Sequence, residues 1–303
     1  MSKHDMRPSK PQADDRPKVS VLIITYNHEE FIAQALESAI NQDVDFDYEI
    51  VVGEDCSTDS TRRTVVEYLE KYPELIRPLL RDENVGMHRN LEMTLRECNG
   101  KYVALLEGDD YWTCPDKLQK QAGFLDENPE FAIVFHNAML MYDDERLGPK
   151  PHRPDDQKEV STIEDLLKGN YIPTCSVMFR NKLIDTIPDW YYTLAMGDWP
   201  LHIFNAQHGK IGYMDEVMAD HRIHSDGAWT AQRNDRKLQL KALIEVYEHL
   251  NGYLEFRYEG LIRSVLSRRY RELAEEYERS GEQDLAEICA GSCAVENILI
   301  ENG

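Results

Sequence analysis

Consecutive acidic residues follow a short apolar run in the first half of the chain. The run Tyr102 to Leu106 is typical of a buried strand, and Glu107-Gly108-Asp109-Asp110 comes directly after it. Carboxylates at the end of a strand lie where open α/β sheets bind ligands. Adjacent acids repel each other and lose hydration on burial unless a cation joins them. Oxygen ligands of this kind suit Mg²⁺ or Mn²⁺, although Gly-Asp-Asp is also ordinary turn chemistry.

The elements that must position these acids alternate between strands and helices. A β-rich run over residues 19–25 ends in Thr25-Tyr26-Asn27, and a second run over residues 48–53 ends in Glu54-Asp55. Apolar residues at helical spacing follow both runs. This alternation predicts a mostly parallel sheet with helices on both faces. The three polar strand ends are therefore expected to converge on one edge of the sheet.

The pattern also divides the chain into parts. Residues 1–17 are polar, charged and rich in proline, which predicts a disordered leader. Residues 18–232 carry the alternating strands and helices, including a strand over 172–180 and a capping box from Ser161 to Glu164. Apolar residues at helical spacing in the range 233–303 predict a C-terminal appendage of three helices.

Composition restricts the class of partner. The chain has 303 residues, with 34 basic and 56 acidic side chains and a net charge of −22. Such a charge argues against a protein that binds nucleic acid by neutralising phosphates. No apolar run of about 18 residues is present, and the leader lacks the apolar core of a signal peptide. The sequence therefore predicts a cytoplasmic protein.

Together, the motifs resemble those of the family 2 glycosyltransferases, inverting enzymes with the GT-A fold that use nucleotide-activated sugars. The resemblance extends from Val19 to Trp229. It rests on Thr25-Tyr26-Asn27, on Glu54 to Asp59 (similar to the family's Asp-Asp-Gly-Ser-Thr-Asp), on the loop of Asn84 and Gly86, and on Gly100-Lys101-Tyr102 leading into Glu107 to Asp110. It implies an α/β, Rossmann-like GT-A domain with a C-terminal helical appendage.

The same resemblance implies roles for residues at the strand ends. Tyr26 would pack on the nucleotide base, Asp55 would accept a hydrogen bond from the base, and Asp109 would lie near the ribose or the sugar. Asp110 would be the main ligand of Mn²⁺ or Mg²⁺. Other residues placed at the nucleotide sugar are Thr25, Asn27 and Asn84. Core packing is the alternative for Tyr26, and a helix cap is the alternative for Asp55.

A second group of residues lies towards the end of the GT-A range. Asp198, in Gly197-Asp198-Trp199, matches the acid that carries the general base in the family, with Trp199 as a wall of the site. A helix cap is the alternative for Asp198. Within His221-Arg222-Ile223-His224, the resemblance places Arg222 at the diphosphate and His224 in the metal shell. The alternative is that these residues tie a loop to the core.

Two positions depart from the family pattern. Glu54 stands where the family has its first Asp, and Cys56 stands where it has Gly. Glu54 can still reach a ribose hydroxyl by its greater length. Cys56 has a side chain where the loop expects none, which restricts the backbone conformations open to it.

The function implied is metal-dependent transfer of a sugar, with inversion, from a nucleotide diphosphate sugar to an acceptor hydroxyl. A UDP or dTDP sugar is the expected donor, and a saccharide or lipid-linked molecule in bacterial surface polysaccharide or lipopolysaccharide assembly is the expected acceptor. A sugar nucleotidyltransferase is one alternative, but it would need a glycine-rich, basic loop after the first strand. A catalytically silent scaffold that binds nucleotide sugars is the other.

The C-terminal helices have two interpretations. Five arginines lie between Arg257 and Arg271, beside a stripe of Leu254, Tyr258, Leu261 and Val265. Such a face could contact the anionic inner face of the cell membrane. We favour the other interpretation, in which the stripe packs on the GT-A domain or in a homodimer, because a local basic cluster works against a net charge of −22.

Overall fold

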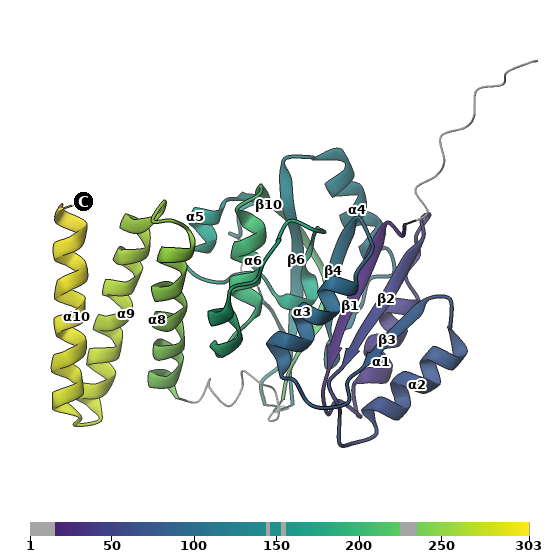
Figure 1. Cartoon of the computed structure of the whole chain (residues 1–303), viewed down its shortest axis with the longest axis horizontal. Helices are drawn as coiled ribbons and strands as arrows, with labels where there is room; N and C mark the ends of the chain where they lie inside the picture. Colours follow the sequence, from purple (N-terminus) through teal and green to yellow (C-terminus); the bar gives the residue numbers. More distant parts are fainter. Residues whose placement is uncertain (1–15, 144–145, 153–155, 225–234, 303) are drawn as a thin grey trace, which may run out of the picture.

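One mixed sheet forms the centre of the protein (Figure 1). The computed structural model describes residues 16–143, 146–152, 156–224 and 235–302, so residues 1–15 of the expected leader and Gly227-Ala228-Trp229 lie outside the described residues. Within these ranges ten strands pair, and eight of them follow the order β3-β2-β1-β4-β9-β6-β10-β5. Strands β3, β2, β1 and β4 pair with one another in parallel, and β10 is parallel to β6.

The strands are β1 (Val19–Thr25), β2 (Tyr48–Glu54), β3 (Ile76–Leu80), β4 (Tyr102–Glu107), β5 (Tyr111–Trp112), β6 (Phe131–Tyr142), β7 (Lys150–Pro151), β8 (Val160–Ser161), β9 (Met178–Arg180) and β10 (Lys210–Ile223). The helices of the sheet domain are α1 (Ile32–Ile40), α2 (Thr61–Lys71), α3 (Met87–Glu97), α4 (Lys117–Glu127), α5 (Ile163–Leu166) and α6 (Asp198–Ala206), with 3₁₀ turns at Thr174–Ser176 and Asp189–Thr193. The C-terminal helices are α8 (Arg236–Tyr253), α9 (Glu259–Arg279) and α10 (Gln283–Asn302).

The direction of the strands confirms the predicted α/β class. Short β9 is antiparallel to both β4 and β6, so the long strands β4, β6 and β10 still run the same way. Strands β1 and β4 are buried on both faces, which explains their continuous apolar sequences. The carboxyl ends of β1, β2, β4 and β10 therefore lie on one edge of the sheet.

Two local predictions were wrong in detail. The capping box consists of Thr162 and Asp165 rather than Ser161 and Glu164, because Ser161 still belongs to β8. The strand expected over 172–180 is reduced to β9. The carbonyl of Pro173 accepts hydrogen bonds from the backbone N–H and the hydroxyl of Ser176, which closes a 3₁₀ turn before the strand can begin.

The three predicted C-terminal helices are present and share a core with the sheet domain. The hydroxyl of Tyr247 on α8 donates to the carbonyl of Leu167 at 2.7 Å, and its ring meets Trp199 edge to face at 5.0 Å. Leu254 and Val265 of the predicted stripe are buried in the same core. The stripe therefore packs inside the protein. In the part of the chain that is described, no helix is long and apolar enough to cross a membrane.

One charged side chain is buried in this core. Lys117 begins α4, is fully buried, and its Nζ has no hydrogen-bond partner among the described residues. The Nζ lies 3.8 Å from the centre of the Trp112 ring. Burial lowers the pKa of Lys117 to about 7, because a charged ammonium loses hydration in the core.

This buried lysine predicts a pH-dependent stability. Below pH 7 Lys117 is charged in the folded and unfolded states, so the cost of its burial is present in full. Between pH 7 and about 10.4 only the unfolded state binds the proton, and the free energy of unfolding rises by up to about 1.4 kcal/mol per pH unit. Urea denaturation across this range should show that Lys117→Met lacks this contribution. The exposed Lys71→Met is the control, and an identical pH profile for all three proteins would contradict the argument.

Candidate active site

The ends of β1 and β4 approach each other closely at Gly108. A Cβ atom at Gly108 would lie 2.5 Å from Thr25 Oγ1 and 2.8 Å from His28 Nδ1. The two loops can therefore touch only because this position has no side chain. Thr25 is buried, and its hydroxyl lies 3.2 Å from His28 Nδ1. This contact brings His28 to the edge where the acidic residues emerge from β4.

Asp109 lies between two histidines. Its Oδ2 is 3.0 Å from His224 Nε2 and 3.9 Å from His28 Nε2. His224 follows β10 and is 6% exposed, whereas the Asp109 side chain is 19% exposed. The His224 ring also packs on Phe31 at 5.0 Å. The fold thus joins residues that are 115 positions apart in the sequence into one polar group.

Asp110 has a different environment from its neighbour. It is 1% exposed, and its Oδ1 accepts a hydrogen bond from the backbone N–H of Arg222 at 2.8 Å. Its Oδ2 is buried and accepts no hydrogen bond from an N–H or O–H group of the described residues. The sequence prediction placed Asp110 beside His224, but the residue in contact with His224 is Asp109.

Arg222 holds the edge of the site together. Its guanidinium lies over the rings of Phe31 and Tyr111, at 5.0 Å and 4.5 Å from their centres. It donates hydrogen bonds to the carbonyl of Asp109 and to the side chain of Gln34. These contacts tie the segment of residues 221–224 to the core, which was the alternative role expected from the sequence.

Asp55 organises the loop that carries Asn84. The two carboxylate oxygens of Asp55 accept hydrogen bonds from the backbone N–H groups of Val85 and Gly86, each at 2.9 Å. The Asn84 side chain donates to the carbonyl of Asp55 at 3.2 Å. Asp55 is 2% exposed, so it lies beneath the loop. Tyr26 is 41% exposed and presents its ring to solvent.

The loops after β1 and β2 are bonded to each other. Asn27 Oδ1 accepts from the backbone N–H of Thr58 at 2.8 Å. Glu54 is fully buried, pairs with Arg62 and accepts from the backbone N–H of Ser57. Glu54 therefore uses both of its carboxylate oxygens to hold its own loop.

Asp198 is the first residue of α6, and it lies near enough to Glu107 for its charge to raise the pKa of that residue. Its Oδ2 accepts a hydrogen bond from Asn170 Nδ2 at 2.8 Å, and its side chain does not cap the helix. Trp199 does not line the site as expected. It is fully buried and donates its ring N–H to the carbonyl of Leu166 at 3.0 Å, so it anchors α6 to the core.

The acidic side chains affect one another electrostatically. Burial and the nearby charges of Asp109, Asp110 and Asp198 raise the pKa of Glu107 well above its usual range. Burial, with a smaller contribution from Asp109, raises the pKa of Asp110 to about 6. Perturbed carboxyl groups in one cluster are a feature of functional sites. The cluster accommodates a cation better than an uncompensated anion.

The donor set at this edge fits a divalent cation. Asp109 and His224 supply one carboxylate and one imidazole on a partly exposed surface. Within the described ranges, no three His, Cys, Asp or Glu residues are grouped to hold a metal by themselves. Two protein ligands with diphosphate and water completing the shell are typical of nucleotide-bound Mg²⁺ or Mn²⁺, and an imidazole favours Mn²⁺.

Sequence reasoning missed three residues that shape this site. His28 and Gly108 meet at the close approach of β1 and β4, and Asn170 positions Asp198. His28 directly follows the Thr25-Tyr26-Asn27 motif, and Gly108 lies inside the acidic motif, so both positions carried a signal. Asn170 carried none, because only the fold brings it to Asp198.

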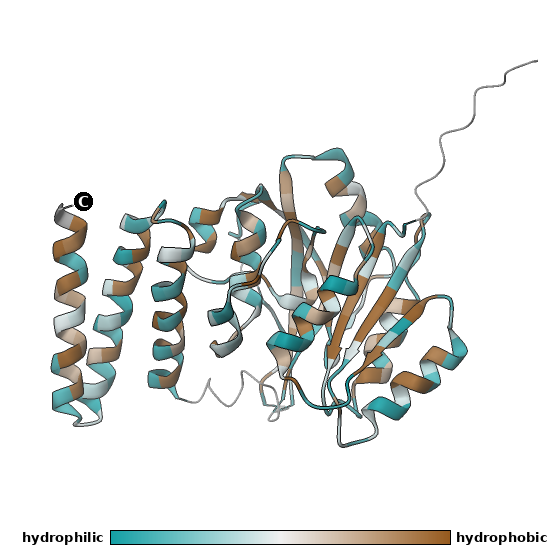
Figure 2. Cartoon of the chain, in the orientation of Figure 1, coloured by the Kyte–Doolittle hydropathy of each residue, from teal (hydrophilic) through white to brown (hydrophobic). Residues whose placement is uncertain are grey.

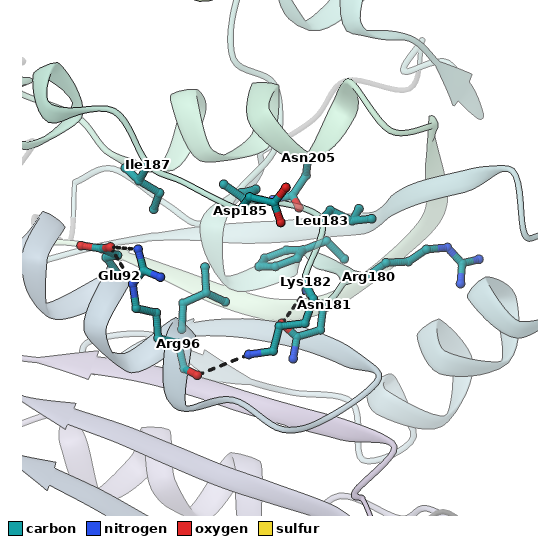
Figure 3. Close-up of a pocket in the computed structure, with 12 residues that line it drawn as sticks. Glu92, Arg96, Arg180, Asn181, Lys182, Leu183, Asp185, Ile187 and Asn205 are labelled. Carbon is teal, nitrogen blue, oxygen red and sulfur yellow. Dashed lines mark hydrogen bonds and ion pairs between the residues drawn. The ribbon is translucent and has the colours of Figure 1, made fainter.

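A cavity lies elsewhere in the protein (Figure 3). It measures about 290 Å³ and is lined by α3, the segment after β9 and the end of α6, with Arg96, Lys182 and Asn205 among its residues. Arg180 pairs with Tyr102, the first residue of β4, whereas the acidic residues follow the last. The cavity and the acidic cluster therefore lie at opposite ends of β4.

The comparisons with known proteins agree with this fold. A sequence model described as Glycosyl transferase family 2 matches residues 20–187. An uncharacterized protein of Mycobacterium tuberculosis (strain ATCC 25618 / H37Rv) is 39% identical over 222 residues, which cover 72% of this chain and 62% of that protein. The putative teichuronic acid biosynthesis glycosyltransferase TuaG of Bacillus subtilis (strain 168) is 35% identical over 211 residues, 69% of this chain and 80% of TuaG. The chain belongs to glycosyl transferase family 2.

Two solved structures share the fold. TarS 1–349 of Staphylococcus aureus in complex with UDP-GlcNAc superposes with a TM-score of 0.57 at 18% identity, covering 91% of each chain. The mannosyltransferase PcManGT of Pyrobaculum calidifontis, in complex with GDP-Man and Mn²⁺, gives a TM-score of 0.56 at 17% identity, covering 93% of this chain and 87% of that one. The predicted GT-A fold is thereby confirmed.

A backbone feature of the site leads to a stability prediction. Cys56, where the family pattern has Gly, has a φ of 59°, and its thiol donates to the carbonyl of Asp82 at 3.5 Å. A left-handed conformation costs a residue with a side chain roughly 1–2 kcal/mol, and glycine costs about 0.5–1 kcal/mol in chain entropy. Cys56→Gly should therefore raise the free energy of unfolding by about 0.5–1 kcal/mol in urea denaturation. Cys56→Ala keeps the strain and should show no gain; equal stability of the two variants would count against strain.

Proposed function

We propose that this chain transfers a sugar from a nucleoside diphosphate sugar to an acceptor hydroxyl, with a divalent cation and with inversion at the anomeric carbon. The observation that carries the proposal is the contact of Asp109 with His224 at the carboxyl edge of the sheet. The exposed Tyr26 follows β1 at the same edge, and the charge of Asp198 acts on Glu107 at the end of β4. Complexes of TarS with UDP-GlcNAc and of PcManGT with GDP-Man and Mn²⁺ support a nucleotide sugar and a metal.

The donor would lie across the ends of β1, β2 and β4. The exposed ring of Tyr26 offers a stacking surface for the base. Asp55 fixes the neighbouring loop by accepting hydrogen bonds from the backbone N–H groups of Val85 and Gly86. Its contribution to base recognition would be to hold this loop in place. Thr25, Asn27, Asn84 and Arg222 act here mainly by fixing the loops that surround the donor.

We assign the cation to Asp109 and His224, and thus move the main ligand from Asp110 to its neighbour. Asp109 is the more exposed of the two acids and its Oδ2 already meets an imidazole, whereas one oxygen of Asp110 is used by the backbone of Arg222. A bound cation would offset the negative charge of the departing diphosphate. Asp110 then serves to hold the end of β10 against β4.

Two nearly isosteric substitutions separate these assignments. Asp109→Asn should weaken Mn²⁺ binding in the presence of UDP by about 10²-fold, because it removes the charged ligand; the factor is of the size seen when groups around metal ligands are lost. Asp110→Asn keeps the oxygen that accepts from Arg222, so it should retain most of the binding. Titration calorimetry with Mn²⁺ and UDP measures both. Loss of Mn²⁺ binding in the Asp110 variant alone would contradict this assignment and identify Asp110 as the main metal ligand.

Asp198 is the proposed general base. It begins α6, and Asn170 holds one of its oxygens, which leaves the other for an acceptor hydroxyl. Deprotonating the acceptor while the donor bond breaks is the step that in-line inversion requires of the protein. Glu107, whose pKa is raised by burial and by the surrounding acids, lies within the electrostatic influence of Asp198 and can donate a hydrogen bond when protonated.

The base assignment is tested by Asp198→Asn. The substitution keeps the shape and removes the basic oxygen, so release of nucleoside diphosphate from a panel of UDP, dTDP and GDP sugars with saccharide acceptors should fall by about 10²- to 10⁴-fold. Affinity for UDP should be unchanged. Asp189→Asn, an exposed acid in the preceding 3₁₀ turn, is the control. Turnover near the unmodified level in the Asp198 variant would leave this residue without a catalytic role.

The setting of the reaction follows from the relatives. TuaG is named for teichuronic acid biosynthesis, and bacterial surface polysaccharide assembly is the setting that we propose. The chain covers 62% of the length of the mycobacterial relative. The activity and the acceptor are therefore proposals for this chain and are not taken from that relative. A saccharide or lipid-linked acceptor would approach along α6, where Asp198 lies.

A further inference from the structure

The outermost helix, α10, exposes a large apolar surface. It lies at the end of the molecule farthest from the sheet (Figure 1), and Figure 2 shows hydrophobic residues along its length. Between 38% and 64% of the surface of six large apolar residues is exposed: Leu285, Ile288, Val295, Ile298, Leu299 and Ile300. Exposed apolar residues grouped in this way mark a contact surface more often than an ordinary solvent face.

The inner face of α10 is already occupied. Ala286, Cys289 and Cys293 are buried against α9. The hydroxyl of Ser267 on α9 lies 3.3 Å from Cys293 Sγ and donates to Asn297 at 2.7 Å. The large apolar residues Leu285, Ile288, Val295 and Leu299 lie on another side of the helix, and 41–64% of the surface of each is exposed.

The spacing of the exposed residues is that of a helix packed on another helix. Leu285, Ile288, Ser292, Val295 and Leu299, here called the outer stripe, follow intervals of three and four residues. This is the spacing of core positions in helix pairs. The stripe is nearly symmetric about Ser292. If two α10 helices run antiparallel with Ser292 at the centre, Leu285 lies opposite Leu299 of the second copy, and Ile288 lies opposite Glu296, one residue from Val295.

The charges on α10 are compatible with the antiparallel arrangement. The helix has no Lys or Arg. Glu296 is ion-paired with Arg263 of α9 at 2.9 Å, and the other acids of the helix are Asp284, Glu287 and Glu301. In the antiparallel pair the position of Asp284, which is the acid nearest the stripe, lies opposite Ile300 of the second copy. A parallel pair would instead place each acid opposite itself, and like charges destabilise such contacts.

The same charges argue against a lipid occupant. Helices that lie on anionic membranes carry Lys and Arg on their polar face. On the neighbouring α9, Arg263, Arg269 and Arg279 are paired with glutamates. The exposed Arg268 and Arg271 lie on α9 and not on the helix that carries the outer stripe. A protein surface with its own apolar stripe is therefore the matching occupant.

We propose that a second copy of this chain covers the outer stripe, with the two α10 helices antiparallel about a two-fold axis near Ser292. A self-complementary patch is what a two-fold interface requires. The small residues Gly291 and Ser292 at the centre allow the helices to approach closely. A pair of 20-residue helices is about 30 Å long, which is short for a stable interface, so the dimer should dissociate on dilution.

The first test is the oligomeric state of the full chain by sedimentation velocity over a dilution series. We expect a monomer–dimer equilibrium that Ile288→Glu with Val295→Glu shifts to monomer at all concentrations. Ala290→Glu adds the same charge on an exposed side of α10 outside the stripe, and should leave the equilibrium unchanged. A monomer at every concentration, or a dimer unaffected by the double substitution, would overturn the proposal.

The second test measures the orientation and does not depend on disrupting the fold. Leu285→Cys and Leu299→Cys are made separately in a chain whose half-buried Cys56 and Cys114 are replaced by Ser. Under mild oxidation a mixture of the two variants should form a 285–299 disulfide, identified by mass spectrometry, and neither variant alone should cross-link. Strong 285–285 cross-linking would overturn the antiparallel pairing. Binding of a monomeric chain to phosphatidylglycerol vesicles, lost in Ile288→Glu with Val295→Glu, would overturn the second copy in favour of lipid.

Discussion

The close approach of β1 and β4 at Gly108 is the constraint on which the rest of the site depends. Only a residue without Cβ lets the loop after β4 pass against Thr25 and His28. Once this contact forms, the chain leaving β4 must turn along the edge of the sheet, where β10 returns with Arg222 and His224. The parallel direction of the long strands then gathers residues from four parts of the sequence in one place.

This convergence concentrates negative charge, and the surrounding structure offsets it in different ways. Backbone N–H groups neutralise part of the charge on Asp55 and Asp110, and Arg62 pairs with the buried Glu54. Asp109 has imidazoles beside it, while the pKa of Glu107 rises through burial and the neighbouring acids. Five acids are thus retained in a chain with a net charge of −22 because each has a separate local environment. In the proposed function, a cation and a diphosphate would bind beside Asp109 and His224.

Sequence alone predicted the fold class, the order of the first strands and helices, and the three C-terminal helices, because these follow from hydrophobic periodicity. It also selected the strand ends that meet at the site. It could not predict that Trp199 turns into the core, since a Trp after the first residue of a helix can face either way until Tyr247 from α8 packs against it. Contacts such as Asn170 with Asp198 arise from the tertiary fold and leave no local pattern.

The sequence also could not predict which of the two adjacent acids, Asp109 or Asp110, contacts His224. Asp109 lies in the turn after β4 and Asp110 directly follows that turn, and of these two adjacent acids the one in contact with His224 is Asp109. Which of them makes this contact is decided by where the chain leaves β4, and that depends on the contact at Gly108 and on the hydrogen bond from Arg222 to Asp110. Because β10 contributes both Arg222 and His224, its backbone binds one acid while its end presents an imidazole to the other. The two acids therefore acquire separate roles from one strand that lies more than a hundred residues away in sequence.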